Sequence, residues 1–502
     1  MSSLNNAFSL SSLNGKNGFK MVGNKNENIG WQVSRAGDIN GDGIEDLIVA
    51  ASSANEYTGK AYVVFGSDDK FSSKINVSKF DGSSGFVING ETPKEVVGFS
   101  VSGAGDMNGD GIDDIIIGAP GENEQLGAGY VMFGSKSKFP SGISVSDLDG
   151  SNGFKIIGDS DDKESSLGFF VSGAGDMNGD GLADIIISAP QGIKNNGGIS
   201  YVLYGSNLTS YPIMDLANSQ DWKGFKFHGV PNSISGQSIS GLGDINGDGL
   251  DDIVIGAHNA NNGKGAAYVV FGSKIESMRD IYPSSLDGKN GFKIQSEKEE
   301  GYLGSSVSGV GDINGDGYND FVVSTTSSGP CGNSPANYVF YGKESFSESI
   351  SISDIDEKDG FIIKDGMGTS LHVNGAGDVN NDGLGDLIIS KSYAMCGGRE
   401  TSYVLFGNKS GFQSEIDINK YNFNGINGFQ INKVHSEDST GYSVSTAGDV
   451  NNDGIADFVL GAPNAGVSYL VFGTEEIIPY TDNDGIIGSF FSLLSDAISV
   501  YF

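Results

Sequence analysis

The sequence contains few of the side chains from which catalytic and nucleic-acid-binding sites are usually built. Its 502 residues include 2 Cys and 4 His, and none of the histidines (His228, His258, His372 and His435) has a Ser, Cys or second His at catalytic or zinc-ligand spacing. Lys and Arg number 30 against 64 Asp and Glu, a formal net charge of −34. Because phosphate recognition requires clusters of basic residues, we expect no nucleic-acid partner. These shortages give no support for an enzyme.

Long apolar segments are also missing. No apolar run reaches the roughly 18 residues that a bilayer-spanning helix needs, so we expect no transmembrane segment. The first residues, Met1 to Asn6, lack the basic and apolar regions of a signal peptide, which leaves the export route open. Long helical patterns are absent before the C-terminus, whereas Gly is abundant at 78 residues and falls at strand ends and turns.

What the sequence does contain is one nine-residue pattern, D-x-N-[GN]-D-G-x-x-D, repeated along the chain. It begins at Asp38, Asp106, Asp176, Asp244, Asp312, Asp378 and Asp449, at intervals of 66 to 71 residues. Length alone would suggest about three domains. A regular period of this size indicates a single repeat array instead.

The pattern has the chemistry of a calcium loop. Oxygen-bearing side chains occupy positions 1, 3, 5 and 9, and position 7 offers its carbonyl, which suits Ca²⁺. Position 6 is always Gly and position 4 is Gly or Asn, the residues that tolerate a positive φ. We therefore predict up to seven Ca²⁺ sites. The predicted ligands are Asp38, Asn40, Asp42, Ile44 and Asp46; Asp106, Asn108, Asp110, Ile112 and Asp114; Asp176, Asn178, Asp180, Leu182 and Asp184; Asp244, Asn246, Asp248, Leu250 and Asp252; Asp312, Asn314, Asp316, Tyr318 and Asp320; Asp378, Asn380, Asp382, Leu384 and Asp386; and Asp449, Asn451, Asp453, Ile455 and Asp457.

The residues that follow each loop exclude the helix-based calcium families. An EF-hand or dockerin loop needs a carboxylate at position 12 and a helix after it. Here position 12 is apolar in every copy, and an apolar stretch such as Ile115 to Ile117 begins directly after position 9. Each loop is therefore predicted to connect two strands.

Aligned on the loops, each repeat contains four short strand patterns. G-x-x-V-S precedes the loop, a strand that often ends in G-A-P follows it, and Y-V-x-F-G and G-F-x-[IVF] complete the repeat. This order predicts an all-β fold, a seven-bladed β-propeller of four-stranded antiparallel blades, over residues 8–473. The last repeat lacks its G-F strand, and an extra one lies at residues 18–22, so we expect this N-terminal strand to close the ring by pairing into the last blade. Residues 474–502 form an apolar tail of unknown role.

The repeats resemble the FG-GAP repeats of integrin α-subunit propellers and of bacterial proteins. Gly98-Phe99 and Gly118-Ala119-Pro120 supply the name-giving elements within one copy. The resemblance implies calcium in the loop between the first and second strands, on the face opposite the one that meets ligands. It also implies an extracellular or cell-surface interaction module with a role in adhesion. This chain departs from integrins by offering the full ligand set in all seven loops.

The partner is left open by the residues. The face opposite the calcium loops could bind a protein or a glycan, and both stay alternatives. A hydrolase with a carboxylate pair in the central channel is the third alternative. If the resemblance holds, binding maps to loops around Gly118 to Pro120 and over residues 324–335 and 390–399, with Lys391 and Arg399 as cations for an acidic partner.

The two tryptophans and the two cysteines are candidates for packing, binding or a disulfide. Trp31 is expected to pack between blades, and Trp222 is a candidate for carbohydrate stacking. Cys331 and Cys396 lie at equivalent places in neighbouring repeats, where a disulfide and two free thiols remain alternatives.

Overall fold

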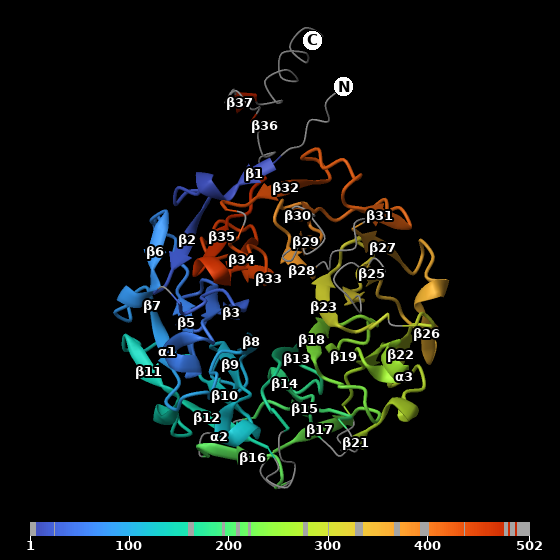
Figure 1. Ribbon diagram of the computed structural model, residues 1–502, viewed down its shortest axis with the longest axis horizontal. Coiled ribbons are helices and arrows are strands. Elements are labelled where there is room, and N and C mark those ends of the chain that lie inside the picture. Colours follow the sequence, from blue (N-terminus) through green and yellow to red (C-terminus); the bar gives the residue numbers. More distant parts are fainter. Residues whose placement is uncertain are drawn as a thin grey trace.

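The computed structural model describes residues 7–24, 26–158, 165–192, 196–206, 211–218, 222–274, 280–299, 301–326, 335–365, 372–391, 401–435, 437–475, 480–481 and 487–488. Within these ranges, seven five-stranded sheets follow one another around a central axis (Figure 1). The predicted all-β, seven-bladed propeller is confirmed.

The first four blades take their four antiparallel strands from residues 33–295. Blade 1 contains β3 (Val33–Gly37), β4 (Asp46–Ala50), β5 (Lys60–Val64), β7 (Gly85–Asn89) and β11 (Gly142–Ser144); blade 2 contains β8 (Ser100–Gly105), β9 (Asp114–Ala119), β10 (Ala128–Met132), β12 (Gly153–Ile157) and β16 (Ile213–Asp215). Blade 3 contains β13 (Val171–Gly175), β14 (Asp184–Ala189), β15 (Ile199–Leu203), β17 (Gly224–His228) and β21 (Asp280–Ile281); blade 4 contains β18 (Ser238–Gly243), β19 (Asp252–Ala257), β20 (Ala266–Val270), β22 (Gly291–Gln295) and β26 (Ser349–Ser351).

The remaining three blades complete the ring. Blade 5 contains β23 (Ser306–Gly311), β24 (Asp320–Ser324), β25 (Ala336–Phe340), β27 (Gly360–Lys364) and β31 (Glu415–Asp417); blade 6 contains β28 (His372–Gly377), β29 (Asp386–Ser390), β30 (Ser402–Leu405), β32 (Gly428–Asn432) and β1 (Ala7–Ser9); blade 7 contains β33 (Val444–Gly448), β34 (Asp457–Ala462), β35 (Val467–Val471), β2 (Gly18–Val22) and β6 (Lys74–Asn76). A separate hairpin pairs β36 (Tyr480–Thr481) with β37 (Ile487–Gly488).

In the described residues, helical structure is confined to short turns between strands. The α-helical turns are α1 (Ala54–Tyr57), α2 (Glu122–Gln125) and α3 (Ala260–Gly263), and the 3₁₀ turns are η1 (Leu10–Ser12), η2 (Val77–Lys79), η3 (Val145–Asp147), η4 (Pro283–Ser285), η5 (Ile352–Asp354) and η6 (Pro463–Ala465).

The fifth strand of each blade was not predicted. It is short and parallel. In six blades the next repeat supplies it from the link between its own third and fourth strands, and in blade 6 it is the N-terminal strand β1. In blade 1, β11 pairs with β7 from Gly142 opposite Val87 to Ser144 opposite Asn89. A strand of two or three residues carries too little alternation to be detected in a sequence. Each blade is therefore bound at its outer edge by its successor.

The N-terminal segment contributes strands to two blades. β2 pairs antiparallel with β35, from Gly18 opposite Val471 to Val22 opposite Val467, and is the fourth strand of blade 7. β1 pairs parallel with β32 in blade 6, which the sequence did not indicate. Residues from the start of the chain thus lie beside residues from its end (Figure 1).

The apolar core lies between neighbouring blades. Second strands such as β4 and β9 are buried along their whole length, and their β-branched and apolar side chains pack across each seam. A phenylalanine from the link of the next repeat stacks on the Phe of the G-F strand at four seams. The pairs are Phe71 on Phe19, Phe139 on Phe86, Phe346 on Phe292 and Phe412 on Phe361, with ring centroids 4.7, 4.5, 4.4 and 4.4 Å apart.

Candidate functional site

The seven acidic loops share one hydrogen-bond arrangement. In the first loop, the backbone N–H of Asp42 donates to Asp38 Oδ1 at 3.0 Å and to Asn40 Oδ1 at 2.9 Å. The N–H of Gly43 donates to Asp38 Oδ2 at 2.8 Å, and the N–H of Ile44 donates to Asp42 Oδ1 at 2.9 Å. The bonds from position 6 to position 1, from 5 to 3 and from 7 to 5 recur in the other six loops. The side chains at positions 1, 3 and 5 are therefore gathered on one stretch of backbone.

Glycine at position 6 is required by the backbone conformation and not by lack of space. Gly43 has a φ of 91°, and a Cβ added there would meet nothing within 4 Å; the same holds at position 6 of all seven loops. Asn381 and Asn452, which replace Gly at position 4, have φ values of 59° and 56°. Left-handed backbone wraps the loop tightly enough for its oxygens to converge.

The aspartate at position 9 is the buried anchor of each loop. Asp46 is fully buried, and its carboxylate accepts hydrogen bonds from Ile39 N at 3.0 Å and from Gly66 N at 2.8 Å. Burial, with smaller contributions from the charges of Asp42 and Asp38, raises the pKa of the Asp46 carboxyl to about 8. The pKa is raised in the same way, chiefly by burial, in the other six loops, at Asp114, Asp184, Asp252, Asp320, Asp386 and Asp457.

These buried carboxylates have no basic partner. Among the ion pairs of the described residues, none includes an aspartate at position 9. Buried charges in proteins are normally paired or bound to a metal. An all-oxygen donor set around a buried, unpaired carboxylate therefore fits a hard cation such as Ca²⁺, and the predicted ligands lie in seven separate loops of like geometry.

The loops also join each blade to the next. In every blade, the N–H of the residue after the third-strand pattern donates to the carbonyl at loop position 2 of the preceding blade. The seven donor–acceptor pairs are Ser67–Val450, Ser135–Ile39, Ser206–Met107, Ser273–Met177, Lys343–Ile245, Asn408–Ile313 and Thr474–Val379, at 2.7 to 2.9 Å. An ordered loop therefore holds a seam as well as its own turn.

The opposite face carries a run of aromatic side chains that we call the aromatic arc: Trp31, Phe99, Phe169 and Tyr442. Each lies just before the first strand of its blade, and these strands surround the central axis (Figure 1). The Trp31 ring is 5.0 Å from that of Tyr442 and 5.9 Å from that of Phe99, and Phe99 is 4.8 Å from Phe169. All four are half-buried. The structure thus places Trp31 between aromatic residues of the adjacent blades.

The aromatic arc spans only part of the ring. Blades 4 and 5 have Gln237 and Ser305 at the corresponding position. In the sequence, an aromatic residue can be recognised at this position of each of these repeats. That the four rings touch one another around blades 7, 1, 2 and 3 can be seen only in the closed ring.

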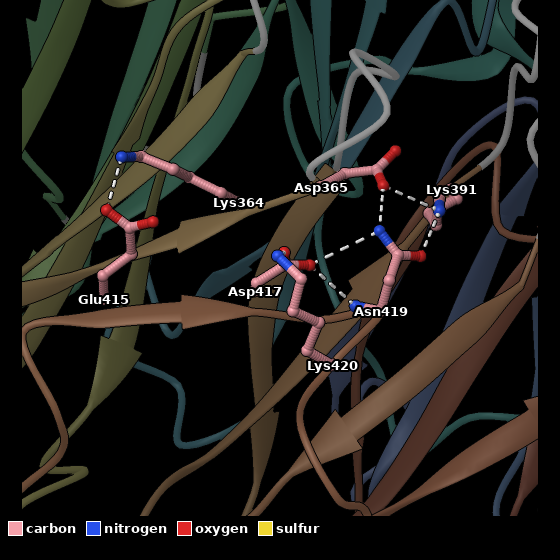
Figure 2. Close-up of polar contacts among 7 residues, drawn as sticks. All are labelled: Lys364, Asp365, Lys391, Glu415, Asp417, Asn419 and Lys420. Atoms are coloured by element: carbon pink, nitrogen blue, oxygen red, sulfur yellow. Dashed lines mark hydrogen bonds and ion pairs between the residues drawn. The ribbon is translucent and has the colours of Figure 1, made fainter.

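The structure corrects the role predicted for Lys391. Its side chain is 3% exposed, and Nζ lies 3.0 Å from Asp365 Oδ1 and 3.1 Å from Asn419 Oδ1 (Figure 2). Asp365 and Asn419 follow β27 and β31 of blade 5, whereas Lys391 follows β29 of blade 6. Lys391 is therefore a buried clamp between two blades and not a surface cation for a partner.

Other predicted residues have different outcomes. Trp222 is half-buried, with the ring of Tyr201 at 6.1 Å and Lys226 Nζ 5.9 Å from its own ring, so part of the indole surface is already covered. Cys331, Cys396 and Arg399 lie outside the described residues. Within the part of the chain that is described, no helix is long and apolar enough to cross a membrane.

Comparison with known proteins agrees with this geometry. The FG-GAP repeat family model matches residues 30–64, 97–132, 168–203, 235–270, 303–341 and 440–475, which are blades 1 to 5 and blade 7. The protein is an integrin-α-like FG-GAP β-propeller. Blade 6 lies outside the six matched stretches of this propeller. In this blade, Ser390-Lys391-Ser392 stands where blades such as blade 2 have G-A-P.

Curated relatives of the FG-GAP propeller are integrin α-subunits. Integrin alpha pat-2 of Caenorhabditis elegans is 31% identical over 240 residues, 45% of this chain and 18% of the relative. Integrin alpha-5 of Xenopus laevis is 27% identical over 238 residues, 45% of this chain and 19% of the relative. The match thus spans less than a fifth of each relative's length. Among solved structures, Sqt1 from Chaetomium thermophilum aligns over 92% of this chain and 100% of its own at 9% identity, with a TM-score of 0.38, too low to bear on the fold.

Proposed function

We propose that this FG-GAP propeller is a calcium-stabilised interaction module of the cell surface or extracellular space, which binds a protein partner on the face of the aromatic arc. The observation that carries the calcium part is the set of seven buried aspartates without a basic partner. The cell-surface setting and the protein partner rest on the similarity to integrin α-subunits.

In each loop the side chains at positions 1, 3, 5 and 9 and the carbonyl at position 7 would hold Ca²⁺. The ion would supply the positive charge that these carboxylates lack. Seven ions would change the net charge from −34 to −34 + 14 = −20, so the propeller stays acidic when loaded.

The aromatic arc suits a protein interface better than it suits a catalytic site. Aromatic side chains are enriched at the buried centres of interfaces, and half-buried rings held by their neighbours lose little freedom on binding. The acidic surface would also speed association with a basic partner through long-range attraction. We therefore expect a partner with a positively charged surface.

The test is a binding screen of the full chain against purified matrix proteins, with Ca²⁺ and with excess EGTA. Binding that requires Ca²⁺ and falls at least tenfold in Trp31→Ala, but not in the control Trp222→Ala on the outer part of blade 3, is the expected result. Binding that survives Trp31→Ala and is lost in variants of the metal-loop face would contradict the proposed surface.

A further inference from the structure

A polar pocket lies at the seam between blades 7 and 1, on the same face as the aromatic arc. It adjoins the arc through the backbone, because Trp31 N donates to the carbonyl of the lining residue Asn28 at 3.2 Å, but no side chain of the arc lines it. Its volume is about 560 Å³, and the side chains that line it are those of Asn, Ser, Glu and Tyr residues. Asn24 and residues 26–28, in the link after β2, form one wall, and Ser53 and residues 55–57, in the turn after β4, form the other. The size is that of a small-ligand site.

The floor of the pocket is held by its own hydrogen bonds. Glu27 is 6% exposed and accepts from Asn24 N at 3.0 Å, from Lys60 Nζ at 2.9 Å and from Tyr62 Oη at 3.0 Å. Both carboxylate oxygens are therefore engaged. Lys60, which reaches Glu27 from the blade 1 side, is neutralised by this pairing.

The rim is different, because its polar groups are free. The side chains of Asn26, Asn55, Glu56 and Tyr57 are exposed, and none of them makes a hydrogen bond or an ion pair with another described residue. Together they present amide donors, amide and carboxylate acceptors and a phenol around one cavity. A ligand with several hydroxyl groups would satisfy them.

Tyr57 is an unusual residue for its place in the turn. It is 58% exposed and has a φ of 64°, beside Asn55 and Glu56 with φ values of 51° and 58°. The equivalent turn in blade 4 has Gly263 at this position, where left-handed backbone costs glycine nothing. A bulky side chain kept in such a conformation at the edge of a cavity points to a role in binding.

We propose that this pocket binds a neutral saccharide unit. The amides and the carboxylate of Glu56 match vicinal hydroxyl groups, and the face of the Tyr57 ring can cover the apolar C–H face of a pyranose. An anionic ligand is disfavoured because Lys60 is already paired with Glu27, no described lining residue is basic, and the chain carries a net charge of −34. A metal ion would find Glu56 as its one free carboxylate among the described lining residues.

Saccharide binding goes beyond the proposed function and does not depend on it. The pocket uses neither the aromatic arc nor the ligands of the calcium loops. Trp31→Ala should therefore leave saccharide binding unchanged, so the two proposals can fail separately.

The test uses the full chain in saturating Ca²⁺ on an array of neutral, sulfated and sialylated glycans, followed by titration calorimetry with the best neutral sugar. Tyr57→Gly and Asn55→Gly keep the left-handed backbone and remove one ligand-facing group each. Both should weaken sugar binding at least tenfold, and Tyr57→Gly should melt at the same temperature as the unchanged chain or higher. Tyr211→Ala, which removes a 65% exposed tyrosine near blade 2, is the matched control.

Three outcomes would overturn the proposal. They are an array on which no neutral glycan is retained, a preference for sulfated or sialylated glycans, and wild-type affinity in Tyr57→Gly or Asn55→Gly. A loss of affinity in Tyr211→Ala equal to that in Tyr57→Gly would overturn it as well, because the effect would then not belong to the pocket.

Discussion

The two faces of the propeller differ in how far the seven repeats agree. On the loop face, each repeat has the same pattern of hydrogen bonds, the same left-handed glycine and the same buried aspartate. On the opposite face, blade 6 has a buried ion pair, blade 1 has a strained exposed tyrosine, and aromatic residues occur in only some blades. If the loops bind Ca²⁺ as we propose, coordination chemistry permits few alternatives and would keep the first face regular. The second face carries loops whose side chains can change without loss of the fold, which is where recognition is usually placed.

The largest loss of stability is expected when calcium is removed, because this treatment acts on the loop face alone. At free Ca²⁺ about tenfold above Kd, each site contributes roughly 1.4 kcal/mol, so seven sites supply on the order of 10 kcal/mol, comparable to the stability of a whole domain. Excess EGTA should lower Tm markedly in differential scanning calorimetry, and added Ca²⁺ should restore it. A Tm that EGTA leaves unchanged would remove the structural role of the loops.

The next largest effect is expected on the opposite face, at the clamp of Lys391. Lys391→Ala removes the cation from the buried Asp365 carboxylate, to which Asn419 Nδ2 still donates at 2.6 Å; an uncompensated buried charge should cost about 3–5 kcal/mol of unfolding free energy. Replacing both residues, Lys391→Met with Asp365→Leu, should recover most of that loss. Lys420→Ala is the control, because Lys420 is 83% exposed in its pair with Asp417, and solvent screens such a pair, so its loss should have far less effect than the loss of Lys391. Equal losses in Lys391→Ala and Lys420→Ala would show that burial of the pair is not what matters.

Single loops should be nearly interchangeable. Asp42→Asn in blade 1 and Asp180→Asn in blade 3 should each lower the free energy of unfolding in saturating Ca²⁺ by about 1.4 kcal/mol, the share of one site. In EGTA the same changes should not destabilise, because they remove repulsion between carboxylates. Asp68→Asn, outside the loops, is the control in both buffers. Destabilisation that persists unchanged in EGTA would mean that the aspartates act without a metal.

The smallest effect on stability is expected at the aromatic arc. Trp31→Ala should lower the affinity for a bound matrix protein at least tenfold. Its Tm should stay closer to wild type than the Tm of Phe139→Ala. The Phe139 ring is buried at a seam, and its loss should cost about 3–5 kcal/mol of unfolding free energy. Ile426→Ala, which trims a 74% exposed apolar side chain before β32, should leave affinity unchanged. Weaker binding in Ile426→Ala than in Trp31→Ala would reverse the choice of face.

Local patterns explain how much of this architecture the sequence could predict. The need for left-handed residues at Gly43 and Asn381 follows from spacing within nine residues and is confirmed, whereas the calcium ligands in the same nine residues stay a prediction. The outer strands, such as β11, escaped notice because they are very short and pair with another repeat. The burial of Lys391 could not be predicted from the sequence either. Asp365 and Asn419 lie 26 and 28 residues away in the chain and contact Lys391 only across a seam between blades. The aromatic arc likewise depends on closure of the ring.

The number of calcium ions bound per chain tests the central claim most directly. Calcium titrated by isothermal calorimetry into metal-free full-length protein, with the stoichiometry checked by native mass spectrometry, should reach about seven ions per chain, as expected for seven loops of equal geometry. A chain that binds none, or that saturates with one or two ions while all seven loops are intact, would contradict the account.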